Sequence, residues 1–238
     1  MMGFLRVVSV ALPVTFWYCV QILWAAYRRS ARLPCLCQEA PRRWARALLH
    51  AADVRVEVEN PERIVADRPQ ILVANHVSYF DVLALSGTVP GKSLYLGKKE
   101  LTRVPLFGPA WQACGHISID RQDKTRAMHS LEIARRRLEE DRPTVILFPE
   151  GTRSVTGELR AFKKGAFVLA IQTGTEVVPA AILGTKDIMR KGSWAIHRGR
   201  TIRVRFGEPI SVEGLHMEDR DELTGRAHAA VAALQAAP

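Results

Sequence analysis

The chain has 238 residues, of which 47% are apolar types and 24% are charged. This composition excludes an intrinsically disordered chain and one that is embedded in a membrane over its whole length. The length suits one α/β domain with an appendage, or two small domains. The formal net charge of +10 leaves nucleic acid, anionic lipid and an acidic protein as candidate partners.

The basic excess lies mainly near the N-terminus. Residues 1–50 have a net charge of +6, whereas the other 188 residues have only +4. The same region contains 21 consecutive uncharged residues, 7–27, which as a helix can cross a hydrocarbon core of about 30 Å. Its tryptophans and tyrosines suit a headgroup interface. These features favour a membrane-attached helix, spanning or lying in one leaflet, over a signal peptide or a buried core helix.

A second basic segment follows the apolar run. Residues 40–52 read as a short amphipathic helix that suits an anionic surface. We therefore expect residues 1–50 to form an N-terminal membrane-associated helical region and residues 51–238 to form the domain that carries the chemistry. If the first helix spans the bilayer, the arginines that follow it place the rest of the chain in the cytoplasm.

The cysteines give no recognisable pairing pattern. Cys35 and Cys37 lack both the CxxC spacing of redox sites and the nearby histidines of a zinc site. The other two, Cys19 and Cys114, lie in the apolar run and at the end of a predicted helix. We therefore expect no disulfide framework and a reducing compartment.

Beyond residue 52, strand and helix signals alternate, which is typical of an α/β sheet with crossover helices. Strands are predicted over 54–58, 71–74, 93–96, 117–119, 144–148, 176–183 and 201–206. Helices are predicted through Leu85, within 99–114, and over 124–140, 164–172 and 220–236.

The first motif that points to chemistry is NHVSYFD at residues 75–81, directly after a predicted strand. Residues i and i+5 of one straight helix point about 140° apart. His76 must therefore lie in the loop before the helix if Asp81, in the first turn, is to reach it. The carboxylate could then fix the imidazole tautomer and leave the other nitrogen to take a proton from a substrate hydroxyl. A helix-capping turn without a catalytic role is the alternative.

Two further segments suit an anionic ligand. Residues 148–154, FPEGTRS, follow another buried strand, at the sheet edge where α/β proteins bind ligands. Gly151 allows close backbone approach, and Thr152 and Arg153 supply hydrogen-bond donors. In residues 98–121, two lysines and an arginine bracket an apolar, glycine-spaced stretch, which suits a lipid with a phosphate head. A polar turn and a solvated loop are the alternatives.

Together, and in this order, the three blocks resemble the glycerolipid acyltransferase family, which includes 1-acylglycerol-3-phosphate acyltransferases. The resemblance covers about residues 50–235. It extends to VVPAAILGT at 177–185, GTKDIMRKGSW at 184–194 and RVRFGEPI at 203–210. It implies the α/β fold of that family, with a central mixed sheet flanked by helices, here preceded by two N-terminal helices.

The resemblance also implies roles for individual residues in a direct transfer without an acyl-enzyme. His76 would deprotonate the acceptor hydroxyl, and Asp81 would orient His76. The residues that would bind the acceptor are Lys99, Arg121, Glu150, Gly151, Thr152 and Arg153. Those that would form the acyl channel are Leu101, Pro105, Phe107 and Gly115. No metal or cofactor is implied, because a thioester is already an activated acyl donor.

We therefore expect an enzyme that moves an acyl group from acyl carrier protein or coenzyme A to the sn-2 hydroxyl of 1-acyl-sn-glycerol 3-phosphate, forming phosphatidic acid. Its partners would be this lysophosphatidic acid, the acyl donor and an anionic membrane, at the cytoplasmic face of the inner membrane. Glycerol 3-phosphate, another lysophospholipid and a lyso-ornithine lipid stay open as acceptors. A non-catalytic membrane-binding module is the alternative, against which the pair of His76 and Asp81 argues. Nucleic acid is not expected, because the N-terminal arginines adjoin an apolar run.

Overall fold

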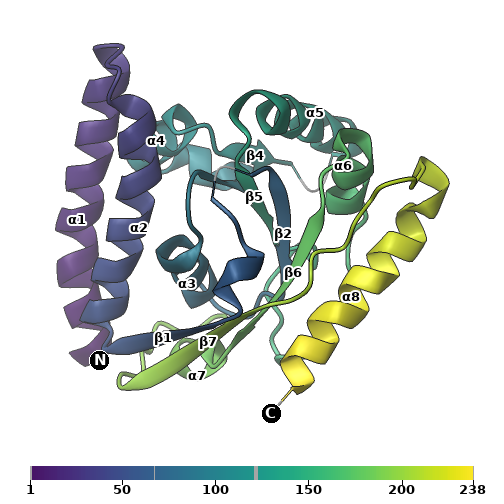
Figure 1. The fold of residues 1–238 in the computed structure, drawn as a ribbon. Helices are drawn as coiled ribbons and strands as arrows, with labels where there is room; N and C mark the ends of the chain where they lie inside the picture. Colours follow the sequence, from purple (N-terminus) through teal and green to yellow (C-terminus); the bar gives the residue numbers. More distant parts are fainter. Residues whose placement is uncertain (1, 67, 121–122, 238) are drawn as a thin grey trace.

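The computed structural model describes residues 2–66, 68–120 and 123–237 as a seven-stranded sheet with helices on both faces (Figure 1). The strands lie in the order β1-β7-β6-β2-β5-β3-β4. All neighbouring strands are parallel except β6 and β7, so the sheet is mixed, as predicted. The strands are β1 (Val54–Glu59), β2 (Gln70–Ala74), β3 (Ser93–Lys98), β4 (Ile117–Ile119), β5 (Thr144–Leu147), β6 (Val177–Leu183) and β7 (Arg200–Phe206).

The predicted helices are all present with shifted ends, and a short helix at Thr185–Ile188 was not predicted. The helix expected over 40–52 begins at Leu33, because Pro34 lies in its first turn, where a missing backbone N–H costs no helical hydrogen bond. The α-helices are α1 (Met2–Tyr27), α2 (Leu33–Ala51), α3 (Phe80–Thr88), α4 (Phe107–Ala113), α5 (Lys124–Asp141), α6 (Gly165–Thr173), α7 (Thr185–Ile188) and α8 (Arg220–Ala236). Three short 3-10 helices are η1 (Pro61–Arg63), η2 (Lys99–Arg103) and η3 (Met217–Asp219).

Both faces of the sheet are buried, because successive side chains of each strand point to opposite faces. On β2, Leu72 and Ala74 belong to the core beneath α2 and α3. Ile71 and Val73 belong to the opposite core, which α5, α6 and α8 cover. Figure 1 shows these two helical layers on either side of the sheet. The continuous apolar runs of the central strands follow from this double burial.

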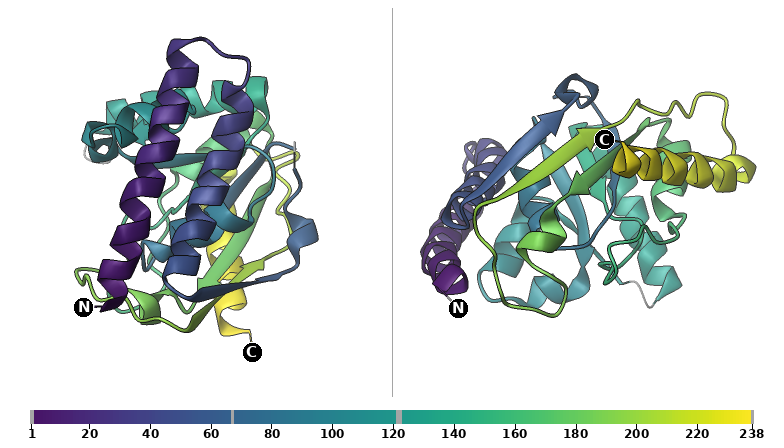
Figure 2. Two further views of the ribbon diagram at one scale, coloured as in Figure 1. Left: turned by 90° about the vertical axis from the view of Figure 1, so that its left-hand side faces the viewer. Right: turned by 90° about the horizontal axis from the view of Figure 1, so that it is seen from below.

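The helices α1 and α2 form a hairpin along one side of the molecule (Figure 2). Within the described ranges, α1 is the one helix that is long and apolar enough, from Gly3 to Tyr27, to cross a membrane. A small core joins this hairpin to α4 through Cys19 and Ile22 of α1, Ala40 of α2 and Ala110 of α4. The hairpin therefore packs on the sheet domain rather than standing apart from it.

A disulfide between Cys37 and Cys114 fastens α2 to the end of α4. The prediction of no disulfide framework is therefore wrong. The two cysteines are 77 positions apart in the sequence. Their proximity arises only when α4 packs against the N-terminal hairpin, so no local spacing pattern could reveal it.

The parallel strands β2, β3, β5 and β6 lie together and end at the same edge of the sheet. The segments that follow them are 75–81, 98–103, 148–154 and 184–191. In α/β folds this edge is where ligands bind. The topology thus gathers the motif segments after these four strands on one side of the molecule, whereas the segment at 203–210 follows the antiparallel β7 to the opposite edge.

Candidate active site

His76 and Asp81 meet as their spacing predicts, with His76 in the loop after β2 and Asp81 in the first turn of α3. Nδ1 of His76 lies 2.8 Å from Oδ2 of Asp81. The same oxygen accepts the backbone N–H groups of Val77 at 2.7 Å and Ser78 at 2.8 Å. Oδ1 accepts the hydroxyl of Thr185 at 2.5 Å. Because Asp81 acts only as an acceptor here, the ring proton of His76 is on Nδ1.

The second ring nitrogen of His76, Nε2, is not used in the contact with Asp81. The imidazole stacks on Phe148, with ring centroids 4.1 Å apart and planes 18° apart. The side chain is 15% exposed and lines a cavity that extends toward the N-terminal helices. With Nδ1 bound to Asp81, Nε2 can accept a proton. A histidine held in this way can act as a general base.

Two buried polar side chains hold the loop that carries His76. The side-chain amide of Asn75 donates to the carbonyl of Ile182 in β6 at 2.9 Å and accepts from its N–H at 2.7 Å. Glu150 accepts the backbone N–H of His76 at 2.6 Å and that of Arg160 at 3.2 Å. Burial raises the pKa of Glu150 above its ordinary value. Both carboxylate oxygens of Glu150 thus accept backbone N–H groups of the protein.

The turn after β5 presents basic groups beside His76. Gly151 has a φ of +75°, a backbone conformation that favours glycine in this turn. The guanidinium of Arg153 lies over the ring of Tyr79, 3.8 Å from its centroid. This stacking orients the guanidinium while leaving its edge free to bind an anion. Thr152 and Arg153 both line the cavity.

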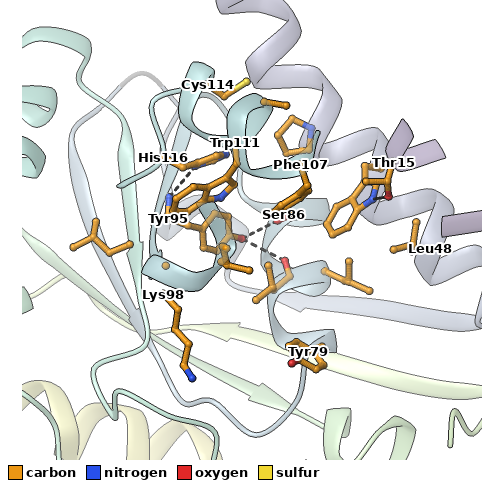
Figure 3. A pocket seen from close by; sticks show the side chains of 18 of the residues that line it. Thr15, Leu48, Tyr79, Ser86, Tyr95, Lys98, Phe107, Trp111, Cys114 and His116 are labelled. Carbon is orange, nitrogen blue, oxygen red and sulfur yellow. Dashed lines mark hydrogen bonds between the residues drawn. The ribbon is translucent and has the colours of Figure 1, made fainter. Parts of the chain in front are cut away.

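The cavity itself has a volume of about 570 Å³, within the range of small-molecule sites. It runs from the loop after β2, which carries His76, to the N-terminal hairpin. In Figure 3, Tyr79 and Lys98 lie at one end and Cys114 at the other. Between these ends the wall is mainly apolar, with Leu48, Leu83 and Trp111 among its residues. Its size and lining suit an acyl chain.

The comparisons with known proteins bear on this geometry. The profile of the Acyltransferase family matches residues 55–183, more than half of the chain. The chain belongs to this acyltransferase family. The matched range contains His76 and Asp81 and the turn after β5. The prediction of an acyltransferase from the motif blocks is thereby confirmed.

Individual relatives agree in name and fold. The 1-acyl-sn-glycerol-3-phosphate acyltransferase of Haemophilus influenzae is 30% identical over 78% of this chain and 76% of its own length. The coconut (Cocos nucifera) enzyme of the same name is 33% identical over 67% of this chain, which spans about half, 51%, of that protein. The crystal structure of the 1-acyl-sn-glycerophosphate (LPA) acyltransferase PlsC from Thermotoga maritima matches 100% of this chain and 96% of that one. Its TM-score is 0.81 at 25% identity, which confirms the predicted fold.

In this acyltransferase the predicted phosphate-binding residues do not all reach the cavity. Nζ of Lys99 lies 2.7 Å from Asp120, and Lys99 is not among the cavity-lining residues. The neighbouring Lys98 lines the cavity, as does Lys191 from the segment after β6. Both lie in segments that carry the family resemblance, 98–121 and 184–194, but neither was assigned a role as an individual residue. Arg121 lies outside the described residues.

Only some of the residues predicted to form the acyl channel of the acyltransferase line the cavity. Leu101 and Phe107 line the cavity, whereas Pro105 and Gly115 do not. Gly115 instead has a φ of +83° in the turn after α4, a conformation that favours glycine. The lining residues that sequence reasoning missed come from α1 and α2 and also from α3, β3 and α4. Their apolar side chains carry no motif that distinguishes a cavity wall from a helix interface.

The polar side chains in the deeper wall of the acyltransferase cavity form hydrogen bonds with one another and with the backbone. The Tyr95 hydroxyl lies 2.9 Å from the Ser86 hydroxyl and donates to the carbonyl of Val82 at 3.3 Å. The backbone N–H of Tyr95 donates to Nδ1 of His116 at 3.1 Å (Figure 3). Burial raises the pKa of Tyr95 and lowers that of His116 to about 4. This part of the wall is therefore uncharged at neutral pH, as an acyl chain requires.

A metal site is not found among residues 2–66, 68–120 and 123–237, where no group of three or more His, Cys, Asp or Glu side chains could hold an ion. The expectation that the acyltransferase uses no metal or cofactor stays a prediction, because it concerns the reaction and not these side chains alone.

Proposed function

We propose that this acyltransferase moves an acyl group from a thioester of coenzyme A or acyl carrier protein to the sn-2 hydroxyl of 1-acyl-sn-glycerol 3-phosphate, forming phosphatidic acid. One observation carries the proposal: the His76–Asp81 pair and the guanidinium of Arg153 face one end of a cavity whose other end is apolar. An acceptor with a phosphate beside a free hydroxyl fits this arrangement. The names of the bacterial and plant relatives and of the solved structure support this acceptor.

In the proposed reaction, Nε2 of His76 takes the proton of the sn-2 hydroxyl as its oxygen attacks the thioester carbonyl. The new C–O ester bond forms and the C–S bond breaks. The thiolate that leaves takes up the proton from Nε2, which restores the neutral imidazole. Asp81, 2.8 Å from Nδ1, stabilises the imidazolium that exists between these steps.

The acceptor headgroup is held at the turn after β5. Arg153, oriented by the ring of Tyr79, binds the phosphate with its planar fork, and Thr152 adds a hydroxyl donor. Lys98 faces the same cavity, and we assign it the role that the sequence suggested for Lys99. Glu150 and Gly151 shape the turn that presents these groups.

We further propose that residues 1–50 are the membrane-associated region of the acyltransferase and residues 51–238 its catalytic domain. One side of α1 packs on α2 and α4, and the opposite side exposes large apolar side chains. Leu12, Trp17, Trp24 and Tyr27 are 62–80% exposed. A helix face of this kind suits the interface and acyl region of a bilayer. We propose that this membrane-associated region lies at the cytoplasmic face of the inner membrane.

The test is an acyl-transfer assay of the full-length protein with both thioester donors and a panel of acceptors. The acceptors are lysophosphatidic acid, glycerol 3-phosphate, lysophosphatidylcholine and a lyso-ornithine lipid. We expect phosphatidic acid from lysophosphatidic acid at the highest kcat/KM. His76→Ala should lower kcat by about 10³-fold or more, with an unchanged circular dichroism spectrum. A better acceptor would overturn the substrate assignment, and retained turnover in the variant would overturn the general-base assignment.

A further inference from the structure

Lys191 reaches the anion-binding turn from a different part of the fold. It lies three residues beyond the end of α7, and its Nζ is 2.8 Å from the carbonyl oxygen of Arg153. The same Nζ is 3.3 Å from Oγ1 of Thr152. These two contacts occupy two of the three N–H donors of the ammonium group. Lys191 also lines the cavity beside His76, so its third donor is available at the site.

The segment that carries Lys191 is anchored to the catalytic loop. The buried hydroxyl of Ser78 donates to the carbonyl of Met189 at 2.7 Å. The backbone N–H of Ser78 also donates to Asp81. The backbone near Lys191 is thus fixed to the loop that holds His76, while its side chain is fixed to the turn after β5. Its ammonium group keeps a defined position relative to both.

The charge at this end of the cavity is uncompensated. Lys98, Arg153 and Lys191 line it, and none of the described lining residues is acidic. Among the described residues, none of these three cations forms an ion pair with a carboxylate. Three cations at a site from which water is partly excluded favour a ligand with more than one negative charge. A phosphate monoester carries about −1.5 to −2 at pH 7, whereas a phosphodiester carries a single charge.

We propose that Lys191 is a specificity-determining residue that selects phosphate monoester acceptors over phosphodiester and phosphate-free ones. The inference rests on the proposed function and adds a third cation to the headgroup site. Its bond to the Arg153 carbonyl brings its charge to the turn from the segment after β6, whereas Arg153 belongs to the turn itself and Lys98 to the end of β3. Lysophosphatidic acid is a monoester, and a monoacylglycerol is the same acceptor without the phosphate.

Lys191→Met tests the inference, because it removes the charge and keeps the length of the side chain. The matched control is Lys186→Met. Lys186, on α7, also donates to a backbone carbonyl of the segment after β5, that of Thr156, but does not line the cavity. For each protein, kcat and KM are measured with lysophosphatidic acid, a monoacylglycerol and lysophosphatidylcholine, at saturating acyl-coenzyme A.

We expect Lys191→Met to raise KM for lysophosphatidic acid by about 10- to 100-fold, the range for a lost hydrogen bond between charged groups. KM for the monoacylglycerol should change less than about 2-fold, and Lys186→Met should change neither KM. Lys191→Arg, which keeps the charge, should restore most of the preference.

Two outcomes contradict the inference, and they are distinguishable. If the wild-type protein uses the monoacylglycerol as well as lysophosphatidic acid, the proposed function fails and the inference fails with it. If the wild type prefers lysophosphatidic acid but Lys191→Met slows all acceptors equally, or acts like Lys186→Met, the inference alone fails. Lys191 would then only support the turn. Lys191→Arg decides the case in which Lys191→Met does not fold.

Discussion

At the scale of single residues, the contacts of Asp81 hold the loop that carries His76 and fix its imidazole. Its two oxygens receive four hydrogen bonds, three from the loop and one from Thr185, and the side chain is fully buried. The carboxylate thus has two roles: it accepts hydrogen bonds from the loop, and it supplies a negative charge. Replacing it by the amide of asparagine, which has the same shape, keeps the first role and removes the second. The amide oxygen of asparagine can still accept the backbone N–H groups of Val77 and Ser78, but it carries no charge to stabilise an imidazolium.

Asp81→Asn should therefore fold and yet lose rate. We expect kcat to fall by about 10²- to 10⁴-fold, the range for impaired general-base catalysis, while KM for lysophosphatidic acid changes much less. Steady-state kinetics measure the effect, and thermal melting followed by circular dichroism is the control for folding. A kcat within 10-fold of the wild type would show that Asp81 only shapes the loop.

The sequence predicted some residues of the site and not others for a physical reason. His76 and Asp81 belong to one short segment, so helix geometry alone fixes how they can meet. The choice between Lys98 and Lys99 depends on how the chain turns at the end of β3 and on Asp120, which pairs with Lys99. Lys191 is far from every other site residue in sequence, and only the topology of β6 brings it to the cavity.

At the scale of elements, α1 combines two surfaces of different chemistry. Its inner side carries Thr15, which accepts the indole N–H of Trp44 at 2.8 Å, and the buried residues Cys19 and Ile22. Its outer side exposes Trp17 and Trp24. Deleting the helix would remove both surfaces at once. Substitutions on the outer side alone separate membrane attachment from packing.

The double variant Trp17→Glu/Trp24→Glu should bind vesicles that contain anionic lipid at least about 10-fold more weakly, because each tryptophan loses its burial in lipid and each glutamate resists insertion. Co-sedimentation with the vesicles measures the bound fraction. Val65→Glu, an exposed apolar position before β2, is the matched control and should bind as the wild type does. Unchanged binding of the double variant would contradict the assignment of α1 as the membrane-facing element.

The elements were predictable to different degrees. Period-two alternation and short apolar runs gave the strands, because burial of one or both sheet faces leaves that pattern in the sequence. The order of strands in the sheet left no such pattern, since periodicity tells which face a side chain occupies and not which strand lies beside it. The apolar pattern predicts a start of α2 that is later than the observed one, because the first turn of the helix is marked by Pro34 and not by that pattern.

At the scale of the whole molecule, the disulfide between Cys37 and Cys114 closes a loop that contains β1, β2, β3, α3 and the catalytic loop. Cross-linking two residues 77 positions apart restricts the unfolded chain. We expect Cys37→Ser to lower the free energy of unfolding by about 4 kcal/mol, measured by urea denaturation without reductant. Cys35→Ser, which changes an exposed free cysteine two residues away, should have no effect. Equal stability of the two variants would show that the disulfide does not form in the protein.

The N-terminal hairpin packs on the sheet domain and also supplies Thr15, Cys19 and Trp44 to the wall of the cavity. Trimming the chain before residue 51 would therefore leave the rest of the acyltransferase with a cavity open to water along one side. Solubilisation has to proceed by redesigning only the outward side chains of α1. The N-terminal hairpin thus exposes apolar side chains on its outer side and forms part of the cavity wall on its inner side.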